Sequence, residues 1–328
     1  MSVLYASAAP SAPSGALDLP TGMSLRWVGP DGQVWDLCSR ESGVYLMAGT
    51  RGLGMPTGTR FRDSSPASHG SQHRGTIWGE RSVFWPIKTW HADKGQAFID
   101  RDRAFFDSLD PERPGRWYAG QPNGNERFLE LRYEPSTQDE GLDIIPSLTG
   151  WARYGIDLVA DQPFWVGKPS VQSWEAPRPL DPTFEPDGPH LLNIGQGFTY
   201  ENAAIDNLGD IESYPRWFVD GETFAGGWVG VGDLRVTLPF TVPAGKCLVI
   251  ESEPAHIGAT MYDVVSPGVK PFERVIGVDM VNPVKMSREL GQADFAAVPP
   301  GKSVPLSISF TGSGIVEAYL PSLYRRAW

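Results

Sequence analysis

Two histidines and two glutamates have the spacings that most invite a chemical interpretation. His69 and His73 are four residues apart, like paired imidazole ligands on one face of a helix. They lie in a Ser/His/Gly tract over 63–75 without a neighbouring Cys or carboxylate pattern, so we expect a solvated loop and no metal site. Glu251 and Glu253 fall on one face of an expected strand, where a glycosidase could hold two carboxylates. Carboxylates so placed on an edge strand are usually surface charges, and we expect no catalysis from them.

The sequence gives no support for a catalytic cysteine nucleophile or for a phosphate-binding loop. Cys38 has no histidine partner in a recognisable setting. Gly49, Gly52 and Gly54 are not followed by a helix and lack the Lys-Ser/Thr pair of a phosphate loop. We therefore predict that the protein is not an enzyme, with no catalytic residue and no cofactor.

Twelve tryptophans could instead provide a platform on which sugars stack. The candidates for such glycan contacts are Trp174, Trp217 and Trp228. Most of the tryptophans fall at alternating positions of expected strands, which favours a place in the core or at a subunit interface. A module that binds carbohydrate on the host surface remains the alternative function.

The composition indicates which elements must position these residues. A chain of 328 residues suits two domains, and 37 glycines with 30 prolines favour short strands over long helices.

The net charge of −11 argues against a basic face that binds nucleic acid. Cys38 and Cys247 could form one disulfide, but we expect two reduced, partly buried thiols, which indicates synthesis in a cytoplasm. We find no signal peptide and no apolar run of the roughly 18 residues that a membrane span requires.

The first half of the chain predicts a domain over 21–170, preceded by a flexible Ala/Ser/Pro-rich arm over 1–20. The turn residues Gly29-Pro30-Asp31-Gly32 separate two short strands. Apolar residues at helical spacing predict a helix over 93–109. The segment 49–79 has no periodic apolar pattern, so we expect a long extended loop that neighbouring subunits order.

Prolines over 171–190 predict a linker to a second domain over 191–328. Short strands at roughly ten-residue spacing there are typical of a β-sandwich or jelly roll. The expected strands are 197–201, 216–219, 228–231, 234–239, 246–251, 260–262, 303–310 and 314–320.

The corner that opens this second domain has its own sequence signature. Asn207 and Gly209 can adopt the positive φ of a tight turn, Asp210 follows them, and Pro215 suits the first residue of a strand. Asp220-Gly221 is a strong hairpin signal. We expect this corner to belong to a sandwich that carries a surface for other proteins.

Three stretches together resemble the distal tail proteins, or minor tail proteins, of long-tailed non-contractile bacteriophages. They are the hairpin at Gly29-Pro30-Asp31-Gly32 with Met47-Ala48-Gly49-Thr50-Arg51-Gly52-Leu53-Gly54, the corner from Asn207 to Pro215, and the closing Val298-Pro299-Pro300-Gly301-Lys302-Ser303, Gly312-Ser313-Gly314 and Tyr324-Arg325-Arg326-Ala327-Trp328. The resemblance covers most of the chain in order. The chain departs from it in the longer 49–79 segment and in the Ala/Ser/Pro-rich start.

The resemblance implies a mainly β protein with an N-terminal belt domain, which closes into a hexameric ring, and a C-terminal galectin-like β-sandwich. It implies a structural virion protein at the distal end of the tail, made in the host cytoplasm, without membrane insertion. The ring would join the tail tube to tip and hub proteins, and DNA would pass through its channel without specific binding, which an acidic chain suits. The residues expected at ring and tube contacts are Arg51, Leu53, Met55, Arg60, Phe61 and Arg62.

Overall fold

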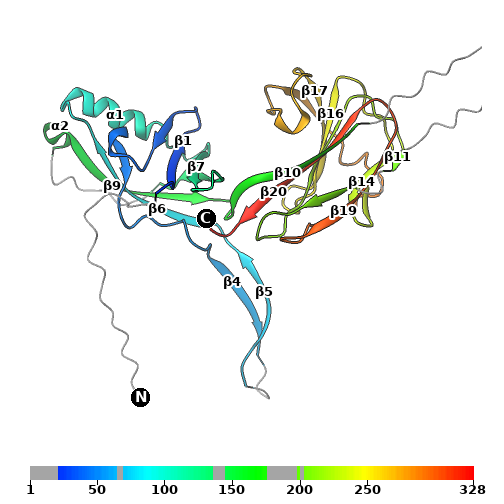
Figure 1. The fold of residues 1–328 in the computed structure, drawn as a ribbon, viewed down its shortest axis with the longest axis horizontal. Coiled ribbons are helices and arrows are strands. Elements are labelled where there is room, and N and C mark those ends of the chain that lie inside the picture. Colours follow the sequence, from blue (N-terminus) through cyan, green and yellow to red (C-terminus); the bar gives the residue numbers. More distant parts are fainter. Residues whose placement is uncertain (1–20, 65–68, 136–144, 176–197, 200–202) are drawn as a thin grey trace, which may run out of the picture. The chain divides into compact units, whose positions relative to one another are not determined.

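The computed structural model describes residues 21–64, 69–135, 145–175, 198–199 and 203–328 (Figure 1). The predicted arm over 1–20 and most of the predicted linker lie outside the described residues. The chain divides into two compact units, Met1–Gly167 with Tyr324–Trp328, and Lys168–Leu323. Both are built mainly of antiparallel strands, so the predicted mainly β fold is confirmed.

The first unit holds two sheets that share strand β8. One has the order β2-β1-β7-β8, and the other brings β3, β6 and β9 beside the far end of β8. The strands are β1 (Ser24–Val28), β2 (Val34–Asp36), β3 (Val44–Leu46), β4 (Gly58–Asp63), β5 (Gln72–Trp78), β6 (Arg81–Trp90), β7 (Gly115–Gly120), β8 (Glu126–Tyr133), β9 (Trp151–Ala160) and the start of β10 (Trp165–Glu175).

Four tryptophans connect the strands of this unit through its core. Trp27, Trp85, Trp117 and Trp165 come from β1, β6, β7 and β10, and each is at most 1% exposed. Neighbouring rings in this order lie with centroids 5.3, 5.2 and 5.2 Å apart, the first two pairs edge to face. These four belong to the core, as the strand alternation indicates, and not to a sugar platform.

The predicted helix is present but shorter than expected. Helix α1 (Gln96–Phe106) buries Phe98 and Phe105 against the sheet. It begins after Gly95, whose φ of 69° is not helical. It ends where the Ser108 and Leu109 N–H groups donate to the carbonyls of Phe105 and Phe106, in i→i+3 hydrogen bonds instead of helical ones. A second, four-residue helix, α2 (Pro146–Thr149), was not predicted.

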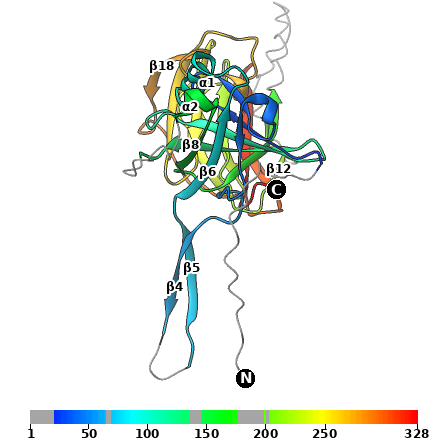
Figure 2. The ribbon, with the colours of Figure 1, turned by 90° about the vertical axis from the view of Figure 1, so that its left-hand side faces the viewer.

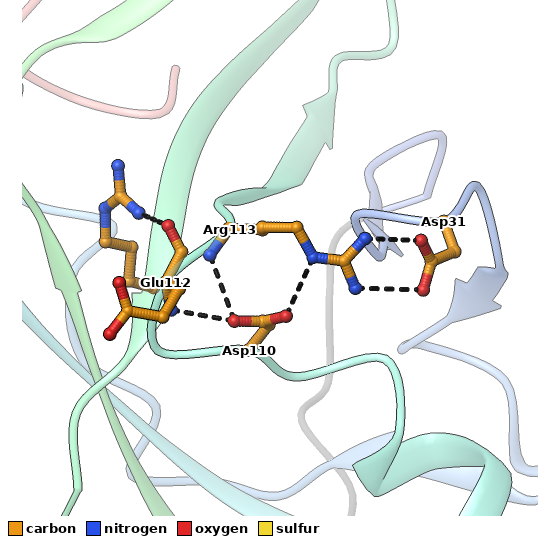
Figure 3. A network of polar contacts seen from close by, with 5 residues as sticks. Asp31, Asp110, Glu112 and Arg113 are labelled. Carbon is orange, nitrogen blue, oxygen red and sulfur yellow. Dashed lines mark hydrogen bonds and ion pairs between the residues drawn. The ribbon is translucent and has the colours of Figure 1, made fainter.

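A polar network fixes the first predicted turn (Figure 3). The Arg113 guanidinium donates to both carboxylate oxygens of Asp31, at 2.6 and 3.1 Å, and to Asp110 at 2.9 Å. Asp110 also accepts the backbone N–H groups of Glu112 and Arg113. These contacts lower the pKa of the Asp31 and Asp110 carboxyls. The network is solvent-exposed and ties the turn at 29–32 to the segment after α1.

The prediction of a loop without regular structure over 49–79 is wrong for two parts of that segment. Strands β4 and β5 form an antiparallel pair that projects from the rest of the first unit (Figures 1 and 2). Sequence periodicity does not reveal them because every residue of β4 is exposed, so no face is buried and no apolar alternation is needed.

The second unit is a β-sandwich. One sheet has the order β18-β17-β16-β13-β20-β10 and the other β11-β19-β14-β15, with β12 beside β19. The strands are β11 (Phe198–Thr199), β12 (Ala204–Asp206), β13 (Arg216–Asp220), β14 (Gly227–Val231), β15 (Leu234–Leu238), β16 (Lys246–Glu251), β17 (Gly258–Val264), β18 (Met280–Lys285), β19 (Ser303–Phe310) and β20 (Ile315–Tyr324). Their inner faces enclose one core, in which Val219, Ile250 and Ile308 are buried.

Two local predictions for this unit are wrong. Asp220-Gly221 is not a hairpin turn, because β13 pairs with β16 and β20 whereas the following β14 pairs with β15 and β19. The turn therefore carries the chain from one sheet to the other. Residues 171–175, assigned to the linker, continue strand β10.

Candidate interaction site: the β4–β5 hairpin and its root

The β4–β5 hairpin pairs with no other strand among the described residues. Its register runs from Gly58 opposite Trp78 to Asp63 opposite Gln72, with a bulge between Phe61 and Arg62. Both outer edges therefore offer unpaired backbone N–H and C=O groups, which are groups that another chain can bind.

The two faces of the hairpin differ in chemistry. Arg60 and Arg62 are two residues apart, and His73 lies opposite Arg62, so all three lie on one face. With Ser71 and Thr76 they line a hollow of about 460 Å³. The other face presents Phe61 and Ile77, which are 48% and 63% exposed. One face is thus basic and the other apolar.

Arg74, the extra residue at the bulge of the hairpin, forms an ion pair with Asp63. Arg74 has no residue opposite in the register, and its Nε lies 2.5 Å from the Asp63 carboxylate. This exposed pair joins the two strands near the tip but adds little stability. It leaves Arg60 and Arg62 without a carboxylate from the same hairpin.

The root of the hairpin, meaning residues 51–54 before β4 and Arg81 after β5, is held together by the buried Arg81 guanidinium. Arg81 is 2% exposed and donates to the carbonyls of Gly52 and Gly54 at 2.7 Å, Pro163 at 2.6 Å and Arg325 at 2.8 Å. Burial without a carboxylate lowers the pKa of Arg81 to about 10. Arg81 therefore joins the entry to the hairpin, the entry to β10 and the returning 324–328 segment.

The structure separates the six residues predicted for ring and tube contacts. Arg60, Phe61 and Arg62 lie on the hairpin, and Met55 is 55% exposed just before it. The remaining two, Arg51 and Leu53, lie at the root. The Arg51 N–H donates to the Phe84 carbonyl at 2.9 Å, while Leu53 packs on the tryptophan-rich core and its carbonyl accepts from Ala327. Leu53 thus packs inside the first unit and is not part of an exposed contact surface.

The corner at 207–215 also has a role within its unit. The buried Asn207 side chain donates to the carbonyls of Ile211 and Val298, at 2.8 Å each, and accepts from the Gly209 N–H. The prediction of positive φ is wrong for both Asn207 and Gly209. Gly209 is required by space, since a Cβ there would lie 2.5 Å from the Leu323 carbonyl oxygen. Asp210 is exposed, and its N–H donates to the same carbonyl.

The candidate sugar-stacking residues do not form a platform. Trp217 is 1% exposed in the sandwich core, so its assignment as a glycan contact is wrong. Trp174 and Trp228 are half-buried, with Trp174 packed on that core and the Arg235 guanidinium 5.1 Å from the Trp228 ring centre. Pro215 is buried directly before β13.

The candidate catalytic groups are occupied by other contacts or inert. Glu251 pairs with Arg216 at 2.7 Å, and Glu253 lies 3.8 Å from His256. Burial raises the pKa of the Cys38 thiol to about 11 and that of Cys247 to about 12, far from the range of a reactive thiolate.

The described residues contain no group of three or more His, Cys, Asp or Glu side chains that could hold a metal ion. None of their helices has the length and apolar character needed to span a membrane.

Comparison with solved structures identifies the fold. The crystal structure of the SPP1 Dit (gp 19.1) protein, described as a paradigm of the hub adsorption apparatus in phages that infect Gram-positive bacteria, matches with a TM-score of 0.53 and 11% identity. The match covers 91% of this chain and 98% of that one. Chains of the phage p2 baseplate in its activated conformation, with Sr or Ca, match with TM-scores of 0.44 and 10% identity, over 89% of this chain and 98% of theirs.

The sequence itself has no match of this kind. No family model matches the chain, and no curated protein matches it. The resemblance to distal tail proteins is therefore confirmed as a likeness of fold.

Proposed function

We propose that this chain is a non-enzymatic structural protein of a phage tail tip, which forms a hexameric ring at the distal end of the tail. The ring joins the tail tube to hub proteins and surrounds the channel through which DNA passes. The observation that carries the proposal is the likeness of fold to a hub protein over 91% of the chain. The predicted localisation in the virion follows from the same proposal.

The geometry of the first unit supports this role. A ring closes through heterologous contacts, in which one surface of each subunit meets a different surface of the next. The projecting hairpin, with two open strand edges and exposed Phe61 and Met55, is a segment of the right kind for such contacts. A net charge of −11 suits a channel wall that does not hold DNA phosphates. The carbohydrate-binding alternative gains no support from the placement of Trp174, Trp217 and Trp228.

The direct test is the position of the chain in the particle. Gold-labelled antibodies against the purified chain should bind only the distal end of tails of the phage that encodes it. Image averaging of those tips should show a six-fold collar. A virion without the chain, or label along the whole tail, would overturn the proposal.

The contact residues have a separate test. Charge reversal at Arg51 and Arg60 should stop tail assembly while the isolated chain stays folded, because both side chains are exposed. Circular dichroism of the purified variant is the control for folding. Normal tails from such a mutant would contradict the assignment of these two residues.

A further inference from the structure

We propose that the β4–β5 hairpin docks on an acidic surface of a second copy of this chain, with Arg60 and Arg62 binding carboxylates of that copy. The proposal rests on the proposed function only in that a ring needs contacts between copies. It adds the chemistry of the contact and the kind of surface that the hairpin meets.

The basic face is free to bind an anion. Neither Arg60 nor Arg62 has an ion-pair or hydrogen-bond partner among the residues that the structure describes, in contrast to Arg74, which holds Asp63. With His73 they surround a hollow whose other lining side chains, Ser71 and Thr76, carry hydroxyl groups. Guanidinium groups placed side by side with hydroxyls suit a carboxylate or a phosphate.

The opposite face decides between these two anions. Phe61 and Ile77 expose large apolar side chains on the back of the same two-stranded ribbon. A ribbon inserted between phosphate backbones would leave these side chains in water or against charge. A protein surface can accept an apolar face and a basic face together, since aromatic residues and arginine are the residues enriched in such interfaces. We therefore infer a protein occupant with carboxylates.

Charge complementarity identifies the occupant as a second copy. Residues 58–78 carry three arginines and one aspartate, and the rest of the chain carries 25 Lys and Arg against 38 Asp and Glu. A hairpin of charge +2 thus belongs to a chain whose remainder has a charge of −13. Opposite charges on the two sides of a contact steer association and fix its register. Each copy carries both halves of this complementary pair.

Hydrogen bonds from Arg81 also fix the root of the hairpin, which lowers the entropy cost of docking. The Arg81 guanidinium holds the carbonyls of Gly52 and Gly54, directly before the hairpin begins, and β6 starts at Arg81 directly after it. An element fixed at both ends loses less conformational entropy when it docks than a free loop would.

The first experiment is sedimentation velocity of the full chain over a range of protein and salt concentrations. The variant Arg60→Glu/Arg62→Glu should need at least about tenfold more protein to associate than the wild type. The matched control is Arg103→Glu/Arg288→Glu, which changes the net charge equally at two exposed arginines elsewhere. The control should associate like the wild type, and salt should weaken wild-type association. Equal association of wild type and hairpin variant, or no association of the wild type, would overturn the proposal.

The second experiment identifies the occupant. The full chain with the photoreactive residue p-benzoylphenylalanine at Ile77 should give a cross-linked product of two copies. The same residue at Val34, which is also exposed in the first unit, should not. In purified particles, a cross-link from position 77 to DNA or to a different tail protein would overturn the proposal.

Failures of the two proposals are distinguishable. If labelled tips contain the chain but position 77 cross-links to another protein, the hairpin assignment fails and the tail-tip function stands. If virions lack the chain while position 77 joins two copies, the tail-tip function fails and the hairpin contact stands.

Discussion

The two units of this protein reach a stable core by different means. The first holds nine of the 12 tryptophans, and four of them touch in sequence across four strands. The second packs mainly Val, Leu, Ile and Ala between two sheets. The charge also divides unequally, with 18 Lys and Arg against 20 Asp and Glu in the first unit and 10 against 19 in the second.

This difference teaches where single substitutions should matter. A core of a few large rings, with one guanidinium joining three segments, depends on each of its members, because no neighbour can fill the space of an indole. A core of many small aliphatic side chains spreads the same burial over more residues and tolerates repacking. The near-neutral first unit is also the one that carries the basic hairpin.

The largest effect is expected from Arg81→Leu. The substitution leaves four backbone carbonyls without the hydrogen-bond donor that Arg81 provides. Because these buried carbonyls remain in the variant, the free energy of unfolding of the first unit should fall by about 4 kcal/mol. Urea unfolding combined with hydrogen exchange of peptides from each unit would measure it. Arg51→Leu, at the exposed root, is the control. A loss below about 1 kcal/mol for Arg81→Leu would contradict the role of the guanidinium.

The buried arginine of the second unit should behave differently. Arg274 pairs with both carboxylate oxygens of Asp220 at 2.8 Å, so Arg274→Leu leaves a largely buried carboxylate and should cost about 3 kcal/mol. Adding Asp220→Asn should restore part of that loss, because the uncompensated charge is gone. The same unfolding measurement applies, and an equal loss in the single and double variants would refute this explanation.

Two tryptophans of one core provide a finer comparison. The Trp27 indole N–H donates to the Ser108 carbonyl and hydroxyl at 3.2 and 3.1 Å, whereas the Trp85 indole N–H has no partner among the described residues. Both substitutions to Phe remove similar volume, but only Trp27→Phe breaks hydrogen bonds. Trp27→Phe should therefore be more destabilising by about 1 kcal/mol in urea unfolding. The opposite order would show that ring packing alone decides.

A buried carboxyl gives the second unit a weak pH dependence. Burial raises the pKa of Glu317 above its ordinary value of 4.5, although the Phe272 N–H donates to it at 3.0 Å and opposes the rise. The folded state then binds a proton that the unfolded state has released, so stability should increase as pH falls from neutrality toward 4.5. Glu317→Gln should remove this increase in unfolding curves measured across that range. An unchanged pH profile would assign the dependence to another group.

The smallest effect on stability is expected in the hairpin. Arg60→Glu/Arg62→Glu changes only exposed side chains without partners, so the free energy of unfolding should stay within about 0.5 kcal/mol of the wild type. Urea unfolding of this variant separates a loss of association from a loss of folding. A larger decrease would mean that the hairpin contributes to the first unit itself.

The sequence predicts an element well where one of its faces is buried. The strand over 303–310 was predicted with its observed bounds because Leu306, Ile308 and Phe310 alternate with polar residues. β18 was missed because Pro283 interrupts it and most of it is exposed. The hairpin strands were missed for the related reason that no residue of either strand is fully buried.

The candidate site divides in the same way. Arg60, Phe61 and Arg62 were identified as exposed groups in an unusual segment, and they lie on the projecting hairpin. The role of Arg81 was not predicted, because its acceptors are backbone carbonyls distant in the chain, and such acceptors leave no residue-type signature. Leu53 was predicted to contact a neighbouring subunit. It packs on the tryptophan-rich core instead, and a single core residue in a segment without apolar periodicity leaves no pattern in the sequence.

The return of Tyr324–Trp328 to the first unit means that the second unit is an insertion within it. A Cβ at Gly167 would lie 2.6 Å from the Tyr324 ring, so the two ends of the insertion meet. Ala327 is fully buried in the tryptophan-rich core, and the Arg325 carbonyl is one of the four held by Arg81. During translation the ribosome therefore makes the whole second unit before it supplies the residues that complete the first. A ribosome-bound chain can fold its inserted sandwich while the first unit is still unfinished, and the first unit is complete only when synthesis has passed residue 327.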